Sequence, residues 1–259
     1  MSSNTVISFV GVGAKYESDK EILSDVSFNI SKGSFYFLSG MSGAGKTTLL
    51  KLIYGLFKQS RGQIKLFGKS ISDLSHDQIT ELRKKMSIVF QEYSLLSHLT
   101  VFDNVALPLR VRNYPEYKVK ELVNNTLEWV GLSRFAENYP KTLSGGQQQR
   151  ISVARAIIVQ PDILLADEPT GNLDDKNASK LMELFVQMNK KFGTTVIIAT
   201  HSLKIMSSYK FPTIIIEDGK VSFTNRTEES TKKTWKGPKP QNYFAELSER
   251  FDKIAENNS

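Results

Sequence analysis

The stretch GMSGAGKTT, residues 40–48, limits what this chain can fold into more than any other feature. It fits the pattern G-x-x-x-x-G-K-[ST], and it stands between the apolar run SFYFLSG, which predicts a buried strand, and GAGKTTLLKLIYGLF, which predicts a helix. The helix is expected to carry Leu49, Leu50, Ile53 and Leu56 on its apolar side. Glycines let backbone N–H groups turn inward, and a helix N-terminus adds partial positive charge. We therefore expect a phosphate-binding loop rather than a glycine-rich turn that binds nothing.

The remaining apolar runs predict an α/β fold. VISFVGVGAKY and ILSDVSFNI alternate as strands do, SIVF, DILLADE and TTVIIATH are short apolar runs, and TIIIEDGKVSF predicts a hairpin around Asp218 and Gly219. Residues 95–159 have a mostly helical pattern. Strands alternating with helices predict a mostly parallel sheet that is covered on both faces.

The chain changes character near Thr224. We expect one domain over residues 1–223, a basic linker over 224–240, and an amphipathic helix over 241–259. Packing of that helix on its own domain is favoured, and docking on a partner is the alternative.

Composition narrows the class of protein and its location. Hydrophobic residues make up 40% and charged residues 24%, as in soluble globular proteins, and the net charge of +7 favours anionic partners. The chain has no cysteine, so it has no disulfide and no thiolate metal site. No secretion signal is seen at the N-terminus, and no apolar run approaches the roughly 20 residues that span a bilayer. We expect a cytoplasmic protein.

Several polar residues follow predicted strands. Asp167 and Glu168 end the run ILLADE, His201 follows TTVIIAT, and Gln91 follows SIVF. Because ligands bind beyond the carboxyl ends of parallel strands, these side chains are candidates for one site. The alternatives are a solvated acidic pair, a structural histidine and an ordinary loop glutamine. Tyr16 is a candidate for stacking on a flat ring or for core packing.

A second candidate for phosphate binding is LSGGQQQR, residues 143–150. It offers a hydroxyl, two glycines and amides just before a helical pattern. The chain therefore has two candidate phosphate-binding segments, residues 40–48 and 143–150, and the presence of the second needs an explanation.

Taken together, these motifs resemble the ATP-binding-cassette ATPases. Tyr16, GMSGAGKTT, Gln91, LSGGQQQ, ILLADE, GNLD and His201 occur in the family's order, over roughly residues 5–223. The resemblance implies a P-loop NTPase (RecA-like) core with an antiparallel β subdomain and a helical subdomain at about 95–159. It also implies an ATP-bound homodimer in which LSGGQ of one chain covers the ATP held by the other, and this would explain two phosphate sites in one chain.

The resemblance also assigns roles to residues. Catalysis would rest on Glu168, which polarises the water, together with His201, Lys46 and Gln91. Mg²⁺ would be held by Thr47, Gln91 and Asp167. ATP would be contacted by Tyr16, Ser42, Gly43, Ala44, Gly45, Lys46, Thr47 and Thr48, and across the dimer by Ser144, Gly145, Gly146, Gln147 and Asp174.

Finer features resemble one subgroup. LADEPTGNLD is similar to lipoprotein-release ATPases, macrolide-export ATPases and the cell-division ATPase family FtsE, and SGAGK, LLKLIYG and VFDNVALPL favour FtsE. This implies a membrane partner like FtsX, activation of cell-wall hydrolysis, and a position on the inner face of the membrane. The partner would dock near Gln91 to Leu99, where Tyr93, Leu95, Leu96 and Leu99 are either exposed anchors or core.

Three alternatives remain. The first is the ATPase of a lipoprotein or macrolide exporter. The second is a nucleic-acid-associated ATPase, which scattered basic residues and a single cassette speak against, so no nucleic acid is expected. The third is a regulator that binds ATP without cutting it, which intact Lys46, Asp167, Glu168 and His201 speak against.

Overall fold

The computed structural model describes residues 4–16 and 21–224. The chain divides into the unit Met1–Arg226 and the unit Thr227–Ser259, and all described residues belong to the first unit. Apart from Thr224, the expected linker and C-terminal helix lie outside the described residues, so the domain boundaries stay predictions. Among the described residues, no helix combines the length and apolar character needed to cross a membrane.

A six-stranded sheet forms the centre of this unit, with the strand order β10-β9-β3-β8-β7-β6. Its parallel strands are β3 (Phe35–Gly40), β6 (Met86–Val89), β7 (Ile163–Asp167), β8 (Thr195–Ala199) and β9 (Thr213–Glu217). Strand β10 (Lys220–Thr224) pairs antiparallel with β9 through a two-residue turn, in which Asp218 and Gly219 have φ of 48° and 74°. The predicted hairpin is confirmed by the pairing of the two strands and by the turn, because two-residue hairpin turns of type I′ have positive φ at both residues.

A second sheet is antiparallel and has four strands in the order β2-β1-β4-β5. The strands are β1 (Thr5–Ala14), β2 (Leu23–Ser31), β4 (Arg61–Leu66) and β5 (Lys69–Ser70). Residues 25–31 of β2 alternate between exposed and buried, because one face of this sheet packs on the core, whereas β1 is mostly buried.

Helix α1 (Lys46–Ile53) lies between the two sheets. Its buried Leu49, Leu50 and Ile53 join one hydrophobic cluster with residues of both sheets. The expected apolar role of Leu56 is wrong: the helix ends at Ile53, Gly55 follows with φ of 71°, and the Leu56 side chain is 48% exposed. A glycine in the left-handed region is a common end to a helix.

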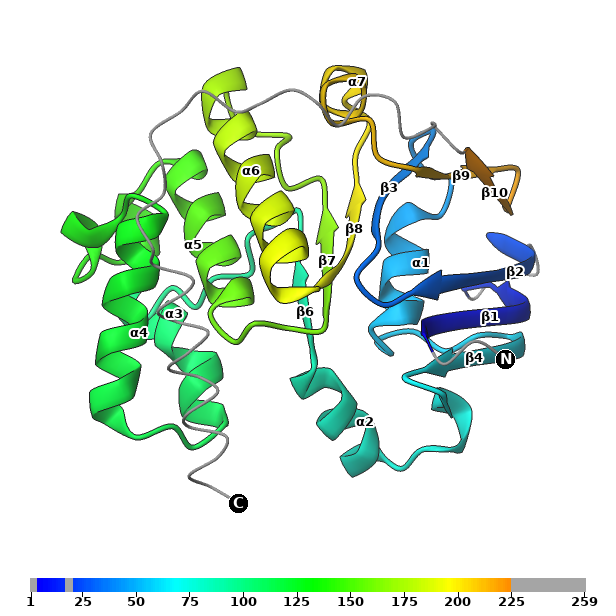
Figure 1. Ribbon diagram of the computed structural model, residues 1–259, viewed down its shortest axis with the longest axis horizontal. Coiled ribbons are helices and arrows are strands. Elements are labelled where there is room, and N and C mark those ends of the chain that lie inside the picture. Colours follow the sequence, from blue (N-terminus) through cyan, green and yellow to red (C-terminus); the bar gives the residue numbers. More distant parts are fainter. Residues whose placement is uncertain (1–3, 17–20, 225–259) are drawn as a thin grey trace. The chain divides into compact units, whose positions relative to one another are not determined.

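The other helices flank the six-stranded sheet or extend beyond it. They are α2 (His76–Lys84), α3 (Val101–Val111), α4 (Glu116–Trp129), α5 (Gly145–Ile157), α6 (Asp175–Phe192) and α7 (Leu203–Tyr209), with short 3₁₀ turns at Ile71–Asp73, Ser133–Phe135 and Pro140–Thr142. Helices α3, α4 and α5 pack together, α5 contacts β6, and α6 contacts β8 (Figure 1). Two sheets, α1 between them and a group of helices α3, α4 and α5 make the architecture that the family resemblance implied.

Candidate active site

Four neighbouring parallel strands end at one edge of the six-stranded sheet, and a predicted site residue stands at or just after the end of each. The order β3-β8-β7-β6 places the loop at residues 40–45 beside His201, Asp167 with Glu168, and Gln91. Parallel strands point the same way, so residues that follow them gather at the same edge. This topology explains how segments so far apart in sequence form one site.

The loop between β3 and α1 is shaped by its glycines. Gly45 caps α1 with φ of 106°, and Gly43 has φ of 78° with open space where a Cβ would stand. A Cβ on Gly40 would lie 2.6 Å from the carbonyl oxygen of Ile216, so only glycine fits there. The Lys46 ammonium donates to the carbonyl oxygens of Gly40 and Met41 at 2.8 and 3.1 Å, curling back over the loop.

The loop opens onto a cavity of about 530 Å³, which the turn between β9 and β10 also lines. Ser42 and Gly43 are exposed there, and Ala44 is half-buried. Backbone N–H groups at a helix N-terminus and one lysine fit a chain of phosphates. The cavity itself is also lined by Glu21, Glu217 and Asp218, and Lys46 is not part of its wall.

The exposed Thr47 is hydrogen-bonded to the buried Asp167. The Thr47 hydroxyl donates to Asp167 Oδ2 at 2.6 Å, and Asp167 is 5% exposed. Burial raises the pKa of Asp167, although the Thr47 hydrogen bond opposes the shift, and the nearby Glu168 charge adds to it. A carboxylate and a hydroxyl are hard oxygen ligands, so this pair fits Mg²⁺ that is also bound by phosphate.

Glu168 contacts His201 directly. The carboxylate Oε1 lies 2.9 Å from His201 Nδ1, and Oε2 accepts from the His201 backbone N–H at 3.4 Å. Glu168 has φ of 48°, in the left-handed region, and its own N–H donates to the Ala199 carbonyl at 2.9 Å. The His201 side chain is 75% exposed and that of Glu168 is 12% exposed. The pair therefore presents an exposed imidazole in front of a fixed, mostly buried carboxylate.

Tyr16 and Gln91 are less constrained. The Tyr16 hydroxyl lies 3.2 Å from the Thr48 hydroxyl, its ring is 4.6 Å from that of Phe57, and it remains 45% exposed. Tyr16 therefore has one aromatic neighbour and also an open side, so ring stacking stays a prediction. Gln91 is exposed at the end of β6.

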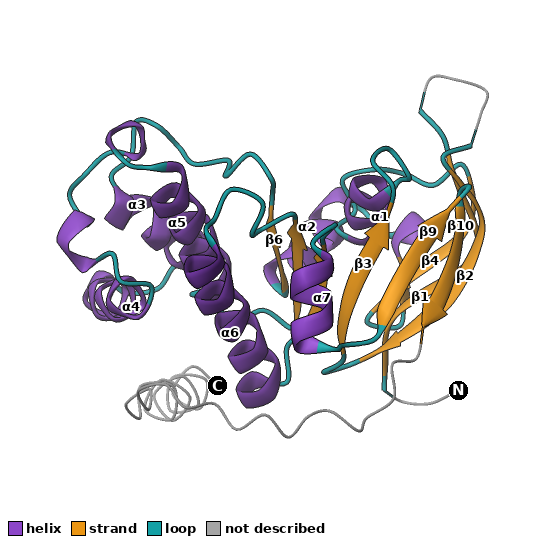
Figure 2. Ribbon diagram, turned by 90° about the horizontal axis from the view of Figure 1, so that it is seen from above, coloured by secondary structure: helices purple, strands orange, loops and turns teal. Residues whose placement is uncertain are grey.

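The LSGGQ segment begins α5. Ser144 caps this helix, with its hydroxyl accepting from Gln147 N–H at 3.4 Å and its own N–H donating to Gln147 Oε1 at 2.8 Å. Gly145 and Gly146 occupy the first turn, where backbone N–H groups lack intrahelical acceptors. Helices α1 and α5 lie apart in both Figure 1 and Figure 2. The chain therefore does not bring Ser144 to its own phosphate loop.

Asp174, after the Asn172–Leu173 segment, caps α6 by accepting from Asn177 N–H at 2.9 Å, and this bond lowers the pKa of Asp174. A Cβ on Gly146 would lie 3.1 Å from Leu173 Cδ2, so the GNLD and LSGGQ segments pack against each other. The structure thus brings these predicted interface residues together.

Sequence reasoning missed the contacts of two residues near the site, Tyr93 and Asn104. The Tyr93 hydroxyl accepts from Asn172 Nδ2 at 3.0 Å, which points it into the chain. Asn104, fully buried on α3, hydrogen-bonds the backbone of Leu96 and Leu99. Leu96 is 36% exposed, while Tyr93, Leu95 and Leu99 are half-buried. The sequence did offer a sign of this role, because Asn104 is a polar residue on the apolar face of the helix VFDNVALPL.

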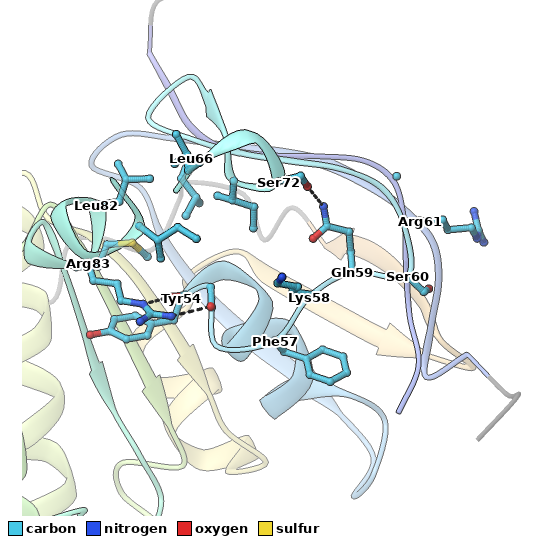
Figure 3. Close-up of a pocket in the computed structure, with 16 residues that line it drawn as sticks. Tyr54, Phe57, Lys58, Gln59, Ser60, Arg61, Leu66, Ser72, Leu82 and Arg83 are labelled. Atoms are coloured by element: carbon cyan, nitrogen blue, oxygen red, sulfur yellow. Dashed lines mark hydrogen bonds between the residues drawn. The ribbon is translucent and has the colours of Figure 1, made fainter. Parts of the chain in front are cut away.

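A separate cavity of about 420 Å³ lies where the end of α1 meets β4 and α2 (Figure 3). Leu66 and Leu82 contribute to its apolar wall. The Arg83 guanidinium donates to the carbonyl oxygens of Tyr54 and Gly55 at 3.2 and 2.7 Å, so this charge is used within the wall. The cavity shares no residue with the predicted site.

Comparison with known proteins gives the family. A family model described as "ABC transporter" matches residues 23–171. The methionine import ATP-binding protein MetN of Clostridioides difficile is 39% identical over 223 residues, which cover 86% of this chain and 70% of that protein. The matched part covers 59% of a second MetN, from Carboxydothermus hydrogenoformans. The cell division ATP-binding protein FtsE of Escherichia coli K12 is 40% identical over 214 residues, which cover 83% of this chain and 96% of that protein.

Solved structures agree. The dimeric post-hydrolysis state of the ATP-binding cassette MJ0796, bound to ADP and Pi, is 33% identical with a TM-score of 0.79, covering 85% of this chain and 98% of that one. CbiO1 of Clostridium perfringens, part of an ABC transporter complex, is 31% identical with a TM-score of 0.76, covering 85% and 87%. With the family model spanning residues 23–171 and these relatives matching along most of its length, the chain belongs to the ABC transporter family as an ATPase domain.

Proposed function

We propose that two copies of this chain pair head to tail around two ATP molecules and that hydrolysis releases the pair. The supporting observation is the division of the phosphate-binding parts. The loop at residues 40–48 gathers with Asp167, Glu168 and His201 at one sheet edge, while Ser144 starts a helix that lies apart. A second copy would supply Ser144, Gly145 and Gly146 to each nucleotide, with a two-fold axis between the copies. The dimeric MJ0796 cassette is consistent with this arrangement.

The contacts at the sheet edge support specific roles in hydrolysis. Lys46 leaves the carbonyls of Gly40 and Met41 to pair with the phosphates. Thr47 and Asp167 would hold Mg²⁺, and that ion would supply positive charge against the phosphates. Glu168 takes a proton from water as the water oxygen bonds to the γ-phosphorus. The bond from that phosphorus to the bridging oxygen breaks, giving ADP and phosphate.

His201 keeps Glu168 in place through its backbone N–H and Nδ1. When Nδ1 carries the ring proton, Nε2 remains as an acceptor. When both ring nitrogens are protonated, Nε2 can donate to the γ-phosphate.

The finer proposal concerns the partner. SGAGK, LLKLIYG and VFDNVALPL resemble FtsE, and the chain matches that relative over 96% of its length. We propose that this chain drives an FtsX-like membrane protein in bacterial cell division, on the inner face of the membrane, and thereby activates cell-wall hydrolysis. Opening and closing of the pair would pass to that partner as movement.

A second candidate has a specific observation behind it. The identity with MetN, 39%, is nearly the same as that with FtsE, and MetN is named for methionine import. The ATPase of a small-molecule importer is therefore the second candidate, beside the exporter ATPases that LADEPTGNLD resembles.

The hydrolytic assignment is tested by Glu168→Gln. The amide preserves the shape of the side chain but cannot accept the proton, so turnover should fall by about 10²- to 10⁴-fold. ATP should then hold the variant as a dimer in sedimentation experiments. Glu128→Gln, an exposed change on α4, is the matched control and should hydrolyse ATP normally. Wild-type turnover by Glu168→Gln would refute the assignment.

The partner is tested by purifying the chain from its native membrane in detergent. Recovery of a four-helix membrane protein with a large external loop supports the FtsX-like partner. An import permease or a multi-domain export permease would replace it.

A further inference from the structure

Tyr93 joins three segments that are distant in sequence. It lies two residues after Gln91, in the loop between β6 and α3, and its hydroxyl oxygen accepts from Asn172 Nδ2 at 3.0 Å. A Cβ on Gly145 would lie 2.9 Å from that same oxygen. The loop after β6, the start of α5 and the segment before α6 therefore meet at a single atom.

The backbone around Tyr93 is held on both sides. Its carbonyl oxygen accepts from the Arg155 guanidinium at 3.2 Å, and Arg155 belongs to α5 itself. Further along the loop, Leu96 and Leu99 are bonded to the side chain of Asn104 on α3. That side chain accepts from Leu96 N–H at 2.9 Å and donates to the Leu96 and Leu99 carbonyls at 3.0 and 3.2 Å. The loop is therefore tied to α5 and α3 through its backbone, while the Tyr93 hydroxyl is held by its bond to Asn172.

Gly145 lies close to the Tyr93 hydroxyl. Gly145 is the first residue of α5 and directly follows the cap Ser144. A Cβ at this position would displace the Tyr93 hydroxyl from its present place. The first turn of α5 and the loop after β6 are thus in close contact at this oxygen.

We propose that Tyr93 is a positioning residue for ATP-driven pairing of two chains. Its hydroxyl fixes the first turn of α5 and Asn172 relative to each other, so both are ready to meet the nucleotide held by a second copy. Tyr93 itself touches no substrate. The inference rests on the proposed function, since pairing is the step that this arrangement serves.

The test is Tyr93→Phe, which keeps the ring and removes the oxygen. In the Glu168→Gln background, with ATP, the dimer dissociation constant measured by sedimentation should rise about fivefold, the effect of one ordinary hydrogen bond. Affinity of the single chain for ATP, measured at low protein concentration, should not change, and the melting temperature should fall by no more than the roughly 2–4 °C that one lost hydrogen bond costs a chain of this size. Tyr117→Phe, a 68% exposed tyrosine on α4, is the matched control.

A double-mutant cycle separates this contact from a general loss of packing. If the Tyr93–Asn172 contact carries the effect, Tyr93→Phe and Asn172→Ala together should weaken pairing little more than either alone. Full additivity, or an unchanged dimer constant in Tyr93→Phe, would overturn the proposal.

Failure of the proposed function gives a different result. In that case Glu168→Gln with native Tyr93 does not pair at all on ATP. The positioning role is then decided in the nucleotide-free chain by amide hydrogen exchange over residues 143–150. Tyr93→Phe should speed exchange there several-fold, and unchanged exchange refutes the inference whether or not the chains pair.

Discussion

Asn104 holds the loop after β6 from inside the helical group, and replacing it by alanine tests how much this matters. The side chain is fully buried on α3, and its amide oxygen accepts from Leu96 N–H at 2.9 Å. Its amide nitrogen faces the carbonyl oxygens of Leu96, Leu99 and Thr100 at 3.0, 3.2 and 2.9 Å. Alanine would leave these loop groups without the partner that ties them to the helix.

The size of the effect follows from the number of bonds. Two amide protons shared among three carbonyls, plus one accepted bond, amount to about three hydrogen bonds. At about 1 kcal/mol each, their loss costs about 3 kcal/mol. The higher helix propensity of alanine returns about 0.5 kcal/mol, so the free energy of unfolding should fall by about 2.5 kcal/mol.

Urea unfolding measures this change. With a slope of about 3 kcal/mol per M for a chain of this size, the midpoint should drop by about 0.8 M. Hydrogen exchange over residues 92–100 should rise at the same time. The control is Asn138→Ala, because Asn138 is exposed and its side chain donates a 3.5 Å bond to Thr142. A loss below about 1 kcal/mol, or unchanged exchange in the loop, would show that Asn104 does not hold it.

Three further changes have defined outcomes. Asp167→Asn should raise the free energy of unfolding at pH 7.5, because burial raises the pKa of Asp167 and its ionisation works against folding. This gain in stability should vanish below pH 3.8, and urea titrations at both pH values check it. Arg110→Gln should make the free energy of unfolding less sensitive to acid below pH 3.8. Arg110 lowers the pKa of Asp103, so the stability that this pair contributes is lost as Asp103 becomes protonated. Equal dependence of the free energy of unfolding on pH in the variant and the wild type would contradict this. His201→Asn should retain more ATP turnover than His201→Ala, because its amide N–H can replace Nδ1 beside Glu168; equal rates would remove the positioning role.

Much of the fold follows from local pattern. Strands β3, β7 and β8 were visible as apolar runs because the sheet is covered on both faces, so most of their residues are buried. The order of motifs then implied which strand ends carry the site.

The sequence predictions that were incomplete or wrong failed for physical reasons. Helix α2 was not foreseen because only Leu82 on it is buried, although its capping box, Ser75 with Gln78, was a readable signal. The helix after the phosphate loop was predicted too long because Gly55 was not taken as its end. The contact of Tyr93 with Asn172 joins residues 79 positions apart, and no local pattern reports such a pairing.

The end of β7 has a consequence for anyone who tries to make this protein more heat-resistant. Glu168 sits in a left-handed backbone conformation that costs a non-glycine residue about 1 kcal/mol, next to a carboxylate buried in the fold. Glycine at position 168 would remove the backbone strain, and asparagine at position 167 would remove the buried charge, so either change would raise the stability of the fold. A selection that rewards survival on heating alone would therefore drift toward chains that no longer cut ATP, so each round needs a second screen for turnover.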